Sequence, residues 1–401
     1  WVEVRRSIVR LIKSGLGDRE RAIPVELLRR AREILFVLLD DPEPDPAEEP
    51  SPMDCDEFRG PANGALNYVR PSALRVLIDY ALVRAELTAK SASTVEPAGP
   101  GPKRLEPKVR EALTWKLDRD EDPSWAVHSV YGHRLSLLYW LDREWVESHI
   151  DQILPEGEDD QDVWLFATAW DSFISFNRFY PPMLETLRPK YRRAVQNLQK
   201  GYVTRSLPMT DKGLAVHLVL EYLSSDYDLD SPTGRESLIR TFFELAPVEA
   251  RGGPAWCLWR IGEDDPSGLE VHWPRARALW EWRMREASAA NHSTDFDEEM
   301  QRFASLLLVA PSHETIGSLW PLMEGMLPHI TRSEHRDIGW RSVEKYLAAE
   351  VERDPMRAIQ FYRLMHDALE SPRTYYAKEA RQILEIAAAH RDSRSEALSL
   401  I

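Results

Sequence analysis

The chain has 401 residues, of which 43% are hydrophobic, so it has material for a core and room for several domains or one long array. Its formal net charge of −15 argues against a general nucleic-acid binder, because neutralising phosphates requires a surplus of Lys and Arg. The longest aliphatic runs, at 34–39 and 306–309, are far shorter than the roughly 20 residues of a membrane-spanning helix, and no membrane segment is expected.

The first 106 residues are predicted to be helical segments on long loops, with helices over 2–14, 24–39 and 72–90. Residues 40–57 carry nine acids, no Lys or Arg, and five prolines, a composition that predicts a solvated loop. A second connector, rich in Pro and Gly, spans 91–107. The chain opens without Met, directly in an apolar-periodic run, and we therefore expect it to be a fragment of a longer protein.

From 107 to 401 the sequence reads as one amphipathic helix after another. Asp354-Pro355 and Ser371-Pro372 each place a capping side chain before a proline at the first helical position, 17 residues apart, which is half of a 34-residue hairpin repeat. We predict an all-α fold, an irregular α-solenoid of antiparallel helical hairpins of the tetratricopeptide or HEAT kind. The expected helices are 108–117, 125–153 broken around Gly132, 160–177, 181–201, 211–224, 233–246, 253–261, 273–290, 295–309, 313–328, 334–353, 356–370 and 374–390.

Two sets of positions in this array carry packing predictions. A stripe of Ala358, Phe361, Met365 and Leu369 is expected to face a second stripe, and small Ala beside large aliphatic residues suits close antiparallel helices. The second stripe consists of Ala380, Ile383, Leu384 and Ala387. His217 lies in a segment that is apolar on all sides, and we interpret it as a hydrogen-bonded core histidine rather than a ligand.

Motifs for phosphate binding and for nucleophilic catalysis are absent from the sequence. Metal sites are not favoured either: His128 and His133 would lie on different helix faces, and His329 and His335 flank a predicted turn. Cys55 and Cys257 lie far apart with no Cys or His at ligand spacing, so we predict two free thiols, a reducing compartment and a cytoplasmic protein. We therefore predict no catalytic, cofactor-binding or metal-binding residues.

Three further polar or aromatic patterns have ordinary structural interpretations. The spacing of Asp226, Asp228 and Asp230 resembles the opening of a calcium loop, but Ser231 and Ser237 stand where that loop needs Gly and Glu, so a polar turn is predicted. The acidic loop 156–162 is expected to be a solvated connection. Aromatic residues are expected to pack between stacked helices, and the alternative is an aromatic-lined groove for a partner's anchor residues or for a sugar. They include Phe166, Trp170, Phe173, Trp256, Trp259, Trp280 and Trp282.

Basic residues concentrate on one expected helix, at Arg188, Lys190, Arg192, Arg193 and Lys200. A solvated face explains them, and the alternative is a patch for an acidic partner.

Two stretches resemble a known family. Residues 63–70 read Asn-Gly-Ala-Leu-Asn-Tyr-Val-Arg before an Ala/Leu-rich helix, and 129–146 run from Ser-Val-Tyr-Gly-His-Arg to Leu-Asp-Arg-Glu-Trp-Val, with Ile-Leu-Pro at 153–155. Together they resemble the C-terminal helical region of large bacterial ATP-binding proteins of the STAND class, which act as anti-phage sensors. The resemblance implies that an effector and a P-loop ATPase lie outside this chain, that oligomerisation proceeds through the full-length protein, and that this part grips a viral protein.

Three functions remain open from the sequence. The first is a protein-recognition module without catalysis, the sensor part of a larger bacterial defence protein, whose partner is a protein, for instance from a phage. The second is a structural or assembly scaffold. The third is a glycan-acting enzyme on an all-α toroid, for which Asp171 beside Trp170 is the candidate pair.

Overall fold

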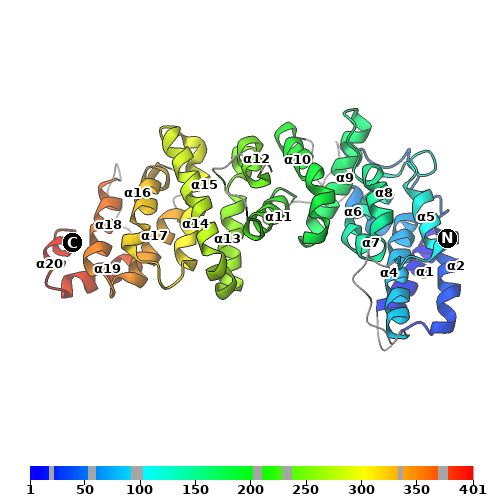
Figure 1. Cartoon of the computed structure of the whole chain (residues 1–401), viewed down its shortest axis with the longest axis horizontal. Helices are drawn as coiled ribbons and strands as arrows, with labels where there is room; N and C mark the ends of the chain where they lie inside the picture. The colour runs from blue at the N-terminus through cyan, green and yellow to red at the C-terminus, as the bar shows by residue number, and fades with distance from the viewer. Residues whose placement is uncertain are drawn as a thin grey trace. The chain divides into compact units, whose positions relative to one another are not determined.

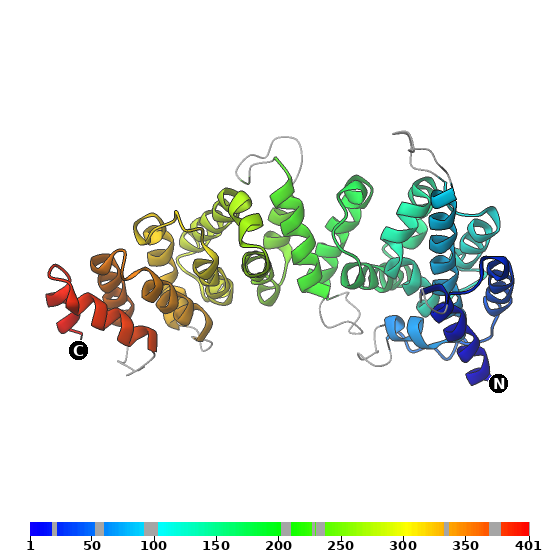
Figure 2. The same cartoon turned by 90° about the horizontal axis from the view of Figure 1, so that it is seen from below.

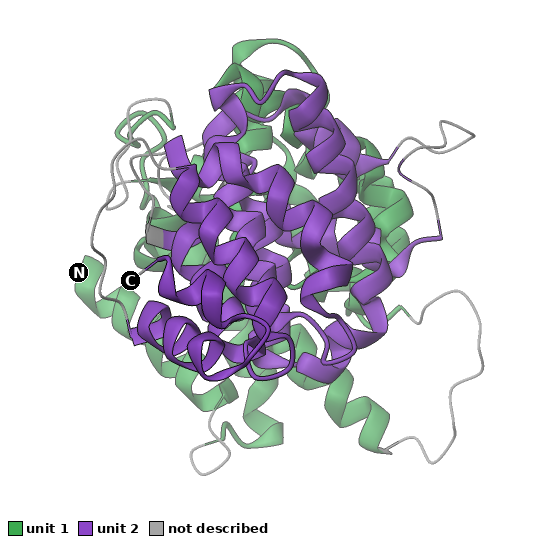
Figure 3. Cartoon of the chain, turned by 90° about the vertical axis from the view of Figure 1, so that its left-hand side faces the viewer, with its two compact units in different colours: residues 1–214 green, residues 215–401 purple. Residues whose placement is uncertain are grey.

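The computed structural model of the chain describes residues 1–17, 22–52, 60–91, 103–201, 210–226, 229, 237–332, 337–368 and 378–400. Within these ranges every regular element is a helix (Figure 1), which confirms the predicted all-α class. The chain divides into two compact units, residues 1–214 and 215–401 (Figure 3), and each unit is treated by itself below. The boundary between the units falls inside α11 (Thr210–Ser224). The sequence analysis divides the chain at residue 106, and the helices before and after that residue both belong to unit 1.

Unit 1 is organised around one central helix, α4. Helices α1, α2, α3, α5, α6 and α7 all contact it, so α4 buries residues on every side instead of one apolar face. The elements of unit 1 are α1 (Val2–Gly17), η1 (Val25–Leu27), α2 (Leu28–Leu38), α3 (Pro61–Asn67), α4 (Val69–Ser91), α5 (Pro107–Leu117), α6 (Trp125–His133), α7 (Leu135–Leu141), α8 (Arg143–Ile153), α9 (Asp160–Phe176), η2 (Pro181–Met183) and α10 (Leu184–Lys200).

The expected helix over 125–153 consists of three helices. The break near Gly132 is confirmed, since α6 ends at His133. A second break, which the sequence analysis missed, lies at Asp142, whose Oδ1 accepts a hydrogen bond from the Trp145 N–H at 3.0 Å and caps α8. An Asp side chain that satisfies the first free N–H groups favours a new helix start over continuation of the old one.

The predicted solvated loop 40–57 is wrong at several positions of its described part, 40–52. Asp41 is 5% exposed and pairs with Arg5 at 2.5 Å. Glu49 accepts hydrogen bonds from the Ser124 hydroxyl at 2.9 Å and from the Trp125 and Ala126 N–H groups at 2.9 and 3.1 Å. These donors surround the N-terminus of α6, where the backbone N–H groups and helix dipole favour a carboxylate. Asp41 and Glu49 are therefore structural, whereas Asp40, Asp45 and Glu48 are exposed, and 53–57 lie outside the described residues.

Replacing Glu49 with Ala is expected to destabilise unit 1 by about 1–3 kcal/mol, because three donors at the start of α6 lose their acceptor. Urea titration with hydrogen-exchange readout should show the loss of protection at residues 124–127. The exposed neighbour Glu48 is the control, and its Ala variant should stay within about 0.5 kcal/mol of the parent. Equal stability of the two variants would contradict the capping role of Glu49.

Unit 2 is a linear array of helices, as predicted for a helical repeat. From α13 to α20 each helix contacts the next one, with or without a short 3-10 segment between, and most also contact the next but one (Figures 1 and 2). This pattern is typical of stacked hairpins. The elements after α11 are α12 (Leu238–Leu245), η3 (Val248–Ala250), α13 (Gly253–Asp264), α14 (Pro266–Ala289), η4 (Thr294–Phe296), α15 (Asp297–Ala304), η5 (Ser305–Val309), α16 (Ile316–Arg332), α17 (Asp337–Glu350), α18 (Pro355–Asp367), α19 (Lys378–Ala389) and α20 (Arg394–Leu398).

The capping prediction at Asp354 is confirmed: its side chain accepts a hydrogen bond from the Arg357 N–H at 3.1 Å, and Pro355 opens α18. The same signature at Asp265-Pro266 opens α14, seven residues before the expected start at 273. Pro274, at the second position of the expected helix, lies inside α14. Ser371-Pro372 lies outside the described residues.

The predicted contact between two apolar stripes is confirmed by the packing of α18 on α19. Every described stripe position except Leu384 is fully buried or nearly so: Ala358, Phe361, Met365, Ala380, Ile383 and Ala387. Leu369 lies outside the described residues. Among the described helices, none is long and apolar enough to cross a membrane.

Candidate functional site

The histidines weighed as metal ligands lie in separate surroundings. His128 is buried, its Nε2 lies 2.9 Å from the Ile153 carbonyl oxygen, and burial lowers its pKa to about 4. His133 stacks on Phe176 with ring centroids 4.3 Å apart. His335 lies outside the described residues, as do Asp228 and Asp230. No group of three or more His, Cys, Asp or Glu side chains suited to a metal ion occurs in the described ranges.

The glycan-enzyme candidate pair lies in the core of unit 1. Trp170 is 2% exposed and Asp171 is 1% exposed, and the Trp170 ring packs between Phe166 and Tyr191. A sugar platform needs an exposed aromatic face, so this pair provides none. The interpretation of the aromatic residues as core is confirmed here, and also for Trp280 and Trp282, which are buried in unit 2.

His217 is buried as expected, and Cys257 is a free thiol as expected. His217 is 2% exposed within α11, which agrees with a core histidine. Cys257 is a buried free thiol, and burial raises its pKa to about 12, so it is protonated and chemically quiet near neutral pH. Cys55 lies outside the described residues.

The basic helix predicted from the sequence is α10, and it is not a uniformly solvated face. Lys190 is 1% exposed, and its Nζ lies 2.5 Å from Asp151 Oδ1 and 2.7 Å from Glu156 Oε1. This correction also concerns the acidic loop, because Glu156 belongs to it. A buried ammonium needs an opposite charge, and the loop after α8 supplies one.

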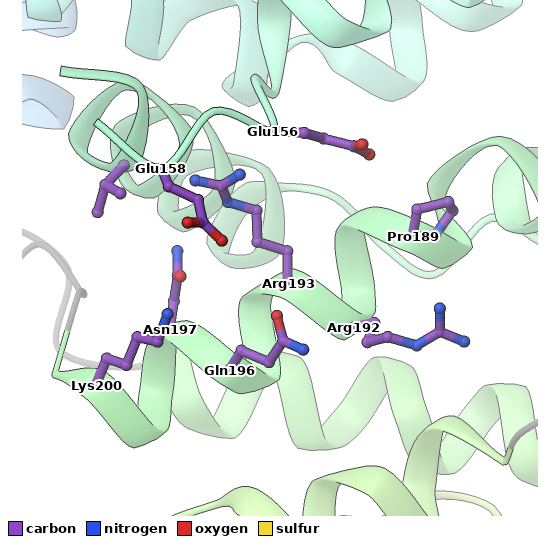
Figure 4. A pocket seen from close by; sticks show the side chains of 9 residues that line it. Glu156, Glu158, Pro189, Arg192, Arg193, Gln196, Asn197 and Lys200 are labelled. Carbon is purple, nitrogen blue, oxygen red and sulfur yellow. The ribbon is translucent and has the colours of Figure 1, made fainter. Parts of the chain in front are cut away.

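A pocket of about 330 Å³ opens between α10 and that loop (Figure 4). Its volume falls in the range of small-ligand or side-chain binding sites. Apart from Val163 and Pro189, every lining residue is polar or charged: Glu156, Glu158, Arg192, Arg193, Gln196, Asn197 and Lys200.

Two of these side chains show how the pocket is built. Arg193 donates a hydrogen bond to the Gly157 carbonyl and lies over the Phe166 ring, 5.1 Å from its centroid, which fixes its guanidinium at the wall. Burial lowers its pKa, an effect that the neighbouring acids oppose, and a guanidinium stays charged regardless. Asn197 is 6% exposed, and its Nδ2 finds no hydrogen-bond acceptor among the described residues. A buried amide without an acceptor is costly, and an oxygen-bearing ligand would satisfy it.

The charges of the pocket favour an anionic group. Three cations line it, Arg192, Arg193 and Lys200, against Glu156 and Glu158. Lys190, which does not line the pocket, pairs with both Glu156 and Asp151. In Figure 4 the carboxylates of Glu156 and Glu158 point in different directions, so they do not form the facing pair that glycoside hydrolysis requires.

The sequence identified the basic helix but not the pocket. The opposite wall comes from residues 156–163, whose composition indicated only a solvated connection. No family model, curated protein or solved structure matches this chain.

Proposed function

We propose that this chain is a protein-recognition module that binds an acidic segment of a partner protein in the α10 pocket. The observation that carries the proposal is Asn197, a buried amide with no acceptor among the described residues, in a pocket lined by Arg192, Arg193 and Lys200. A carboxylate entering this pocket would gain charged donors and would satisfy that amide. The linear helical array of unit 2 supports a recognition role, because such arrays present extended surfaces.

The resemblance to anti-phage STAND proteins extends this proposal to a sensor role. In that form the chain is the recognising part of a larger bacterial defence protein, and the acidic segment belongs to a viral protein. Any ATPase or effector would then reside in another part of that protein. The competing function is an assembly scaffold, whose partner is a host protein present with or without infection.

The test is a quantitative capture with three baits: the parent chain, an Arg192→Glu/Lys200→Glu variant and an Arg178→Glu control. Arg178 is exposed and lies outside the pocket lining, so it matches the sign of the change without altering the pocket. We expect the partner to be retained by the parent and the control and to be lost, at least tenfold, from the pocket variant. Binding of a synthetic acidic segment of that partner should then follow the same order.

Lysates of infected and uninfected bacteria separate the two roles. A viral protein recovered only after infection supports the sensor, whereas the same host protein from both lysates supports the scaffold. A partner that the pocket variant binds as well as the parent would show that recognition takes place elsewhere on the chain.

A further inference from the structure

A second basic cluster lies in unit 1, on helices other than α10. It joins Lys13 of α1, Arg75 of α4 and Arg134, which connects α6 to α7. Helix α4 packs against α1, α6 and α7, and this packing brings the three cations together. Asp79, one helical turn after Arg75, is the acid of this cluster.

The single carboxylate is already engaged. Arg134 Nη2 lies 2.8 Å from Asp79 Oδ1 and 3.1 Å from Asp79 Oδ2. Neither Arg75 nor Lys13 has a hydrogen bond or ion pair within the described part of the chain. Among the described residues, three cations against one carboxylate leave two positive charges without an opposite charge.

Arg75 is the informative member of the cluster. It is 8% exposed, and its Nε is buried without a hydrogen-bond partner. Placing a guanidinium in the core without an anion is costly, and structural arginines at comparable burial have partners. Elsewhere in unit 1, Arg70 is equally buried and its Nε also lacks a hydrogen bond, but that Nε pairs with Asp122 at 2.8 Å and the other two nitrogens donate to backbone carbonyls.

The electrostatics of the surroundings agree with an excess of positive charge. Repulsion from Arg75, together with burial, lowers the pKa of Lys13. Burial and then repulsion from Arg134, Arg75 and Lys13 lower the pKa of His133 to about 4, so this imidazole is neutral near pH 7. Asp79 is the one neighbouring group that acts to raise the pKa of Lys13 and of Arg75.

We propose that Lys13, Arg75 and Arg134 form a binding site for a phosphate group. A phosphate dianion matches the two uncompensated charges, and its oxygens accept from the guanidinium and ammonium donors. Beside the cluster, Phe176 is 46% exposed and stacks on His133, so an aromatic ring carried by the ligand has a surface to stack on. This site is independent of the α10 pocket and of the recognition proposal.

The test measures binding of inorganic phosphate, pyrophosphate and adenosine 5′-diphosphate to the full chain by calorimetry at low ionic strength. We expect at least one of these anions to bind, and Arg75→Met and Lys13→Ala each to weaken that binding about tenfold or more. Arg178→Met and Lys108→Ala are the matched controls; both residues are exposed and lie outside the cluster, and binding should change less than twofold. Equal binding of pyrophosphate and the nucleotide identifies a bare phosphate ligand, whereas tighter binding of the nucleotide identifies a ligand that also uses Phe176.

Stability provides a second readout. Because Arg75 is an unpartnered buried cation, Arg75→Met should leave the thermal midpoint of the free protein unchanged or raise it, while the upward shift caused by the anion is lost. If Arg75→Met does not fold, the binding measured with Lys13→Ala tests the proposal, because Lys13 is exposed and its replacement should not disturb folding. Failure of all three anions to bind the parent, or unchanged binding in both variants, overturns the proposal.

Discussion

Gly132→Ala is expected to destabilise unit 1 by roughly 3 kcal/mol, the upper end of the range for overpacking. A Cβ at Gly132 would lie 1.9 Å from the carbonyl oxygen of Ala169, far inside van der Waals contact. That oxygen belongs to the backbone of α9, so no side-chain rotation relieves the clash and the two helices must separate. The expected result is a lower urea midpoint, with loss of hydrogen-exchange protection in α6 and α9.

Gly17→Ala is the control for this prediction. No atom lies within 4 Å of a Cβ at Gly17, and a helical Ala restricts the unfolded chain more than Gly does. Its free energy of unfolding should therefore be unchanged or higher by up to about 1 kcal/mol. A Gly132→Ala variant that stays as stable as the parent would show that α6 and α9 do not approach as closely as the structure has them.

Glu299→Ala is expected to cost unit 2 about 3–5 kcal/mol, because it leaves a buried cation without compensation. Glu299 is 0% exposed and accepts from Arg283 at 2.5 and 3.1 Å. Arg283 is 4% exposed and also lies over the rings of Phe243 and Trp282, so solvent has little access to its guanidinium. Burial raises the pKa of Glu299, and the hydrogen bond and charge of Arg283 oppose that shift.

Two further variants distinguish the ion pair from the mere loss of volume. Glu298 is exposed, and Glu298→Ala should change the free energy of unfolding by less than about 0.5 kcal/mol. The double variant Arg283→Met/Glu299→Leu should recover most of the stability, since an apolar pair of similar volume carries no desolvation cost. A double variant as unstable as Glu299→Ala would contradict the electrostatic explanation.

Helix positions were predictable because their signals are local. Apolar periodicity and the Asp-Pro pair at 354–355 depend on neighbours within four residues, and both were confirmed. The missed start of α14 was also readable locally, because Asp265-Pro266 repeats the Asp-Pro signature of 354–355. The resemblance to STAND sensors and the identity of a partner stay predictions.

One wall of the candidate site was predictable from the sequence. The basic helix from Arg188 to Lys200 was singled out, but the acids opposite follow α8, and their composition predicted a solvated connection. The sequence contains no pattern that predicts the basic cluster of Lys13, Arg75 and Arg134. Arg75 is one charge in an Ala/Leu-rich helix, and the other two residues lie about 60 positions before and after it.

The sequence by itself therefore determined the all-α class, most helix starts and the apolar stripes, because these follow from the spacing of neighbouring residues. Only the tertiary structure decided which charges are buried and what compensates them. Glu49 accepts a hydrogen bond from Ser124, which lies 75 residues later in the sequence, and Lys190 pairs with Asp151, which lies 39 residues earlier. From composition alone, a charged side chain is expected to be solvated. Once the fold buries that side chain, the cost of desolvation requires an opposite charge or a hydrogen-bond partner, which can come from a distant part of the chain.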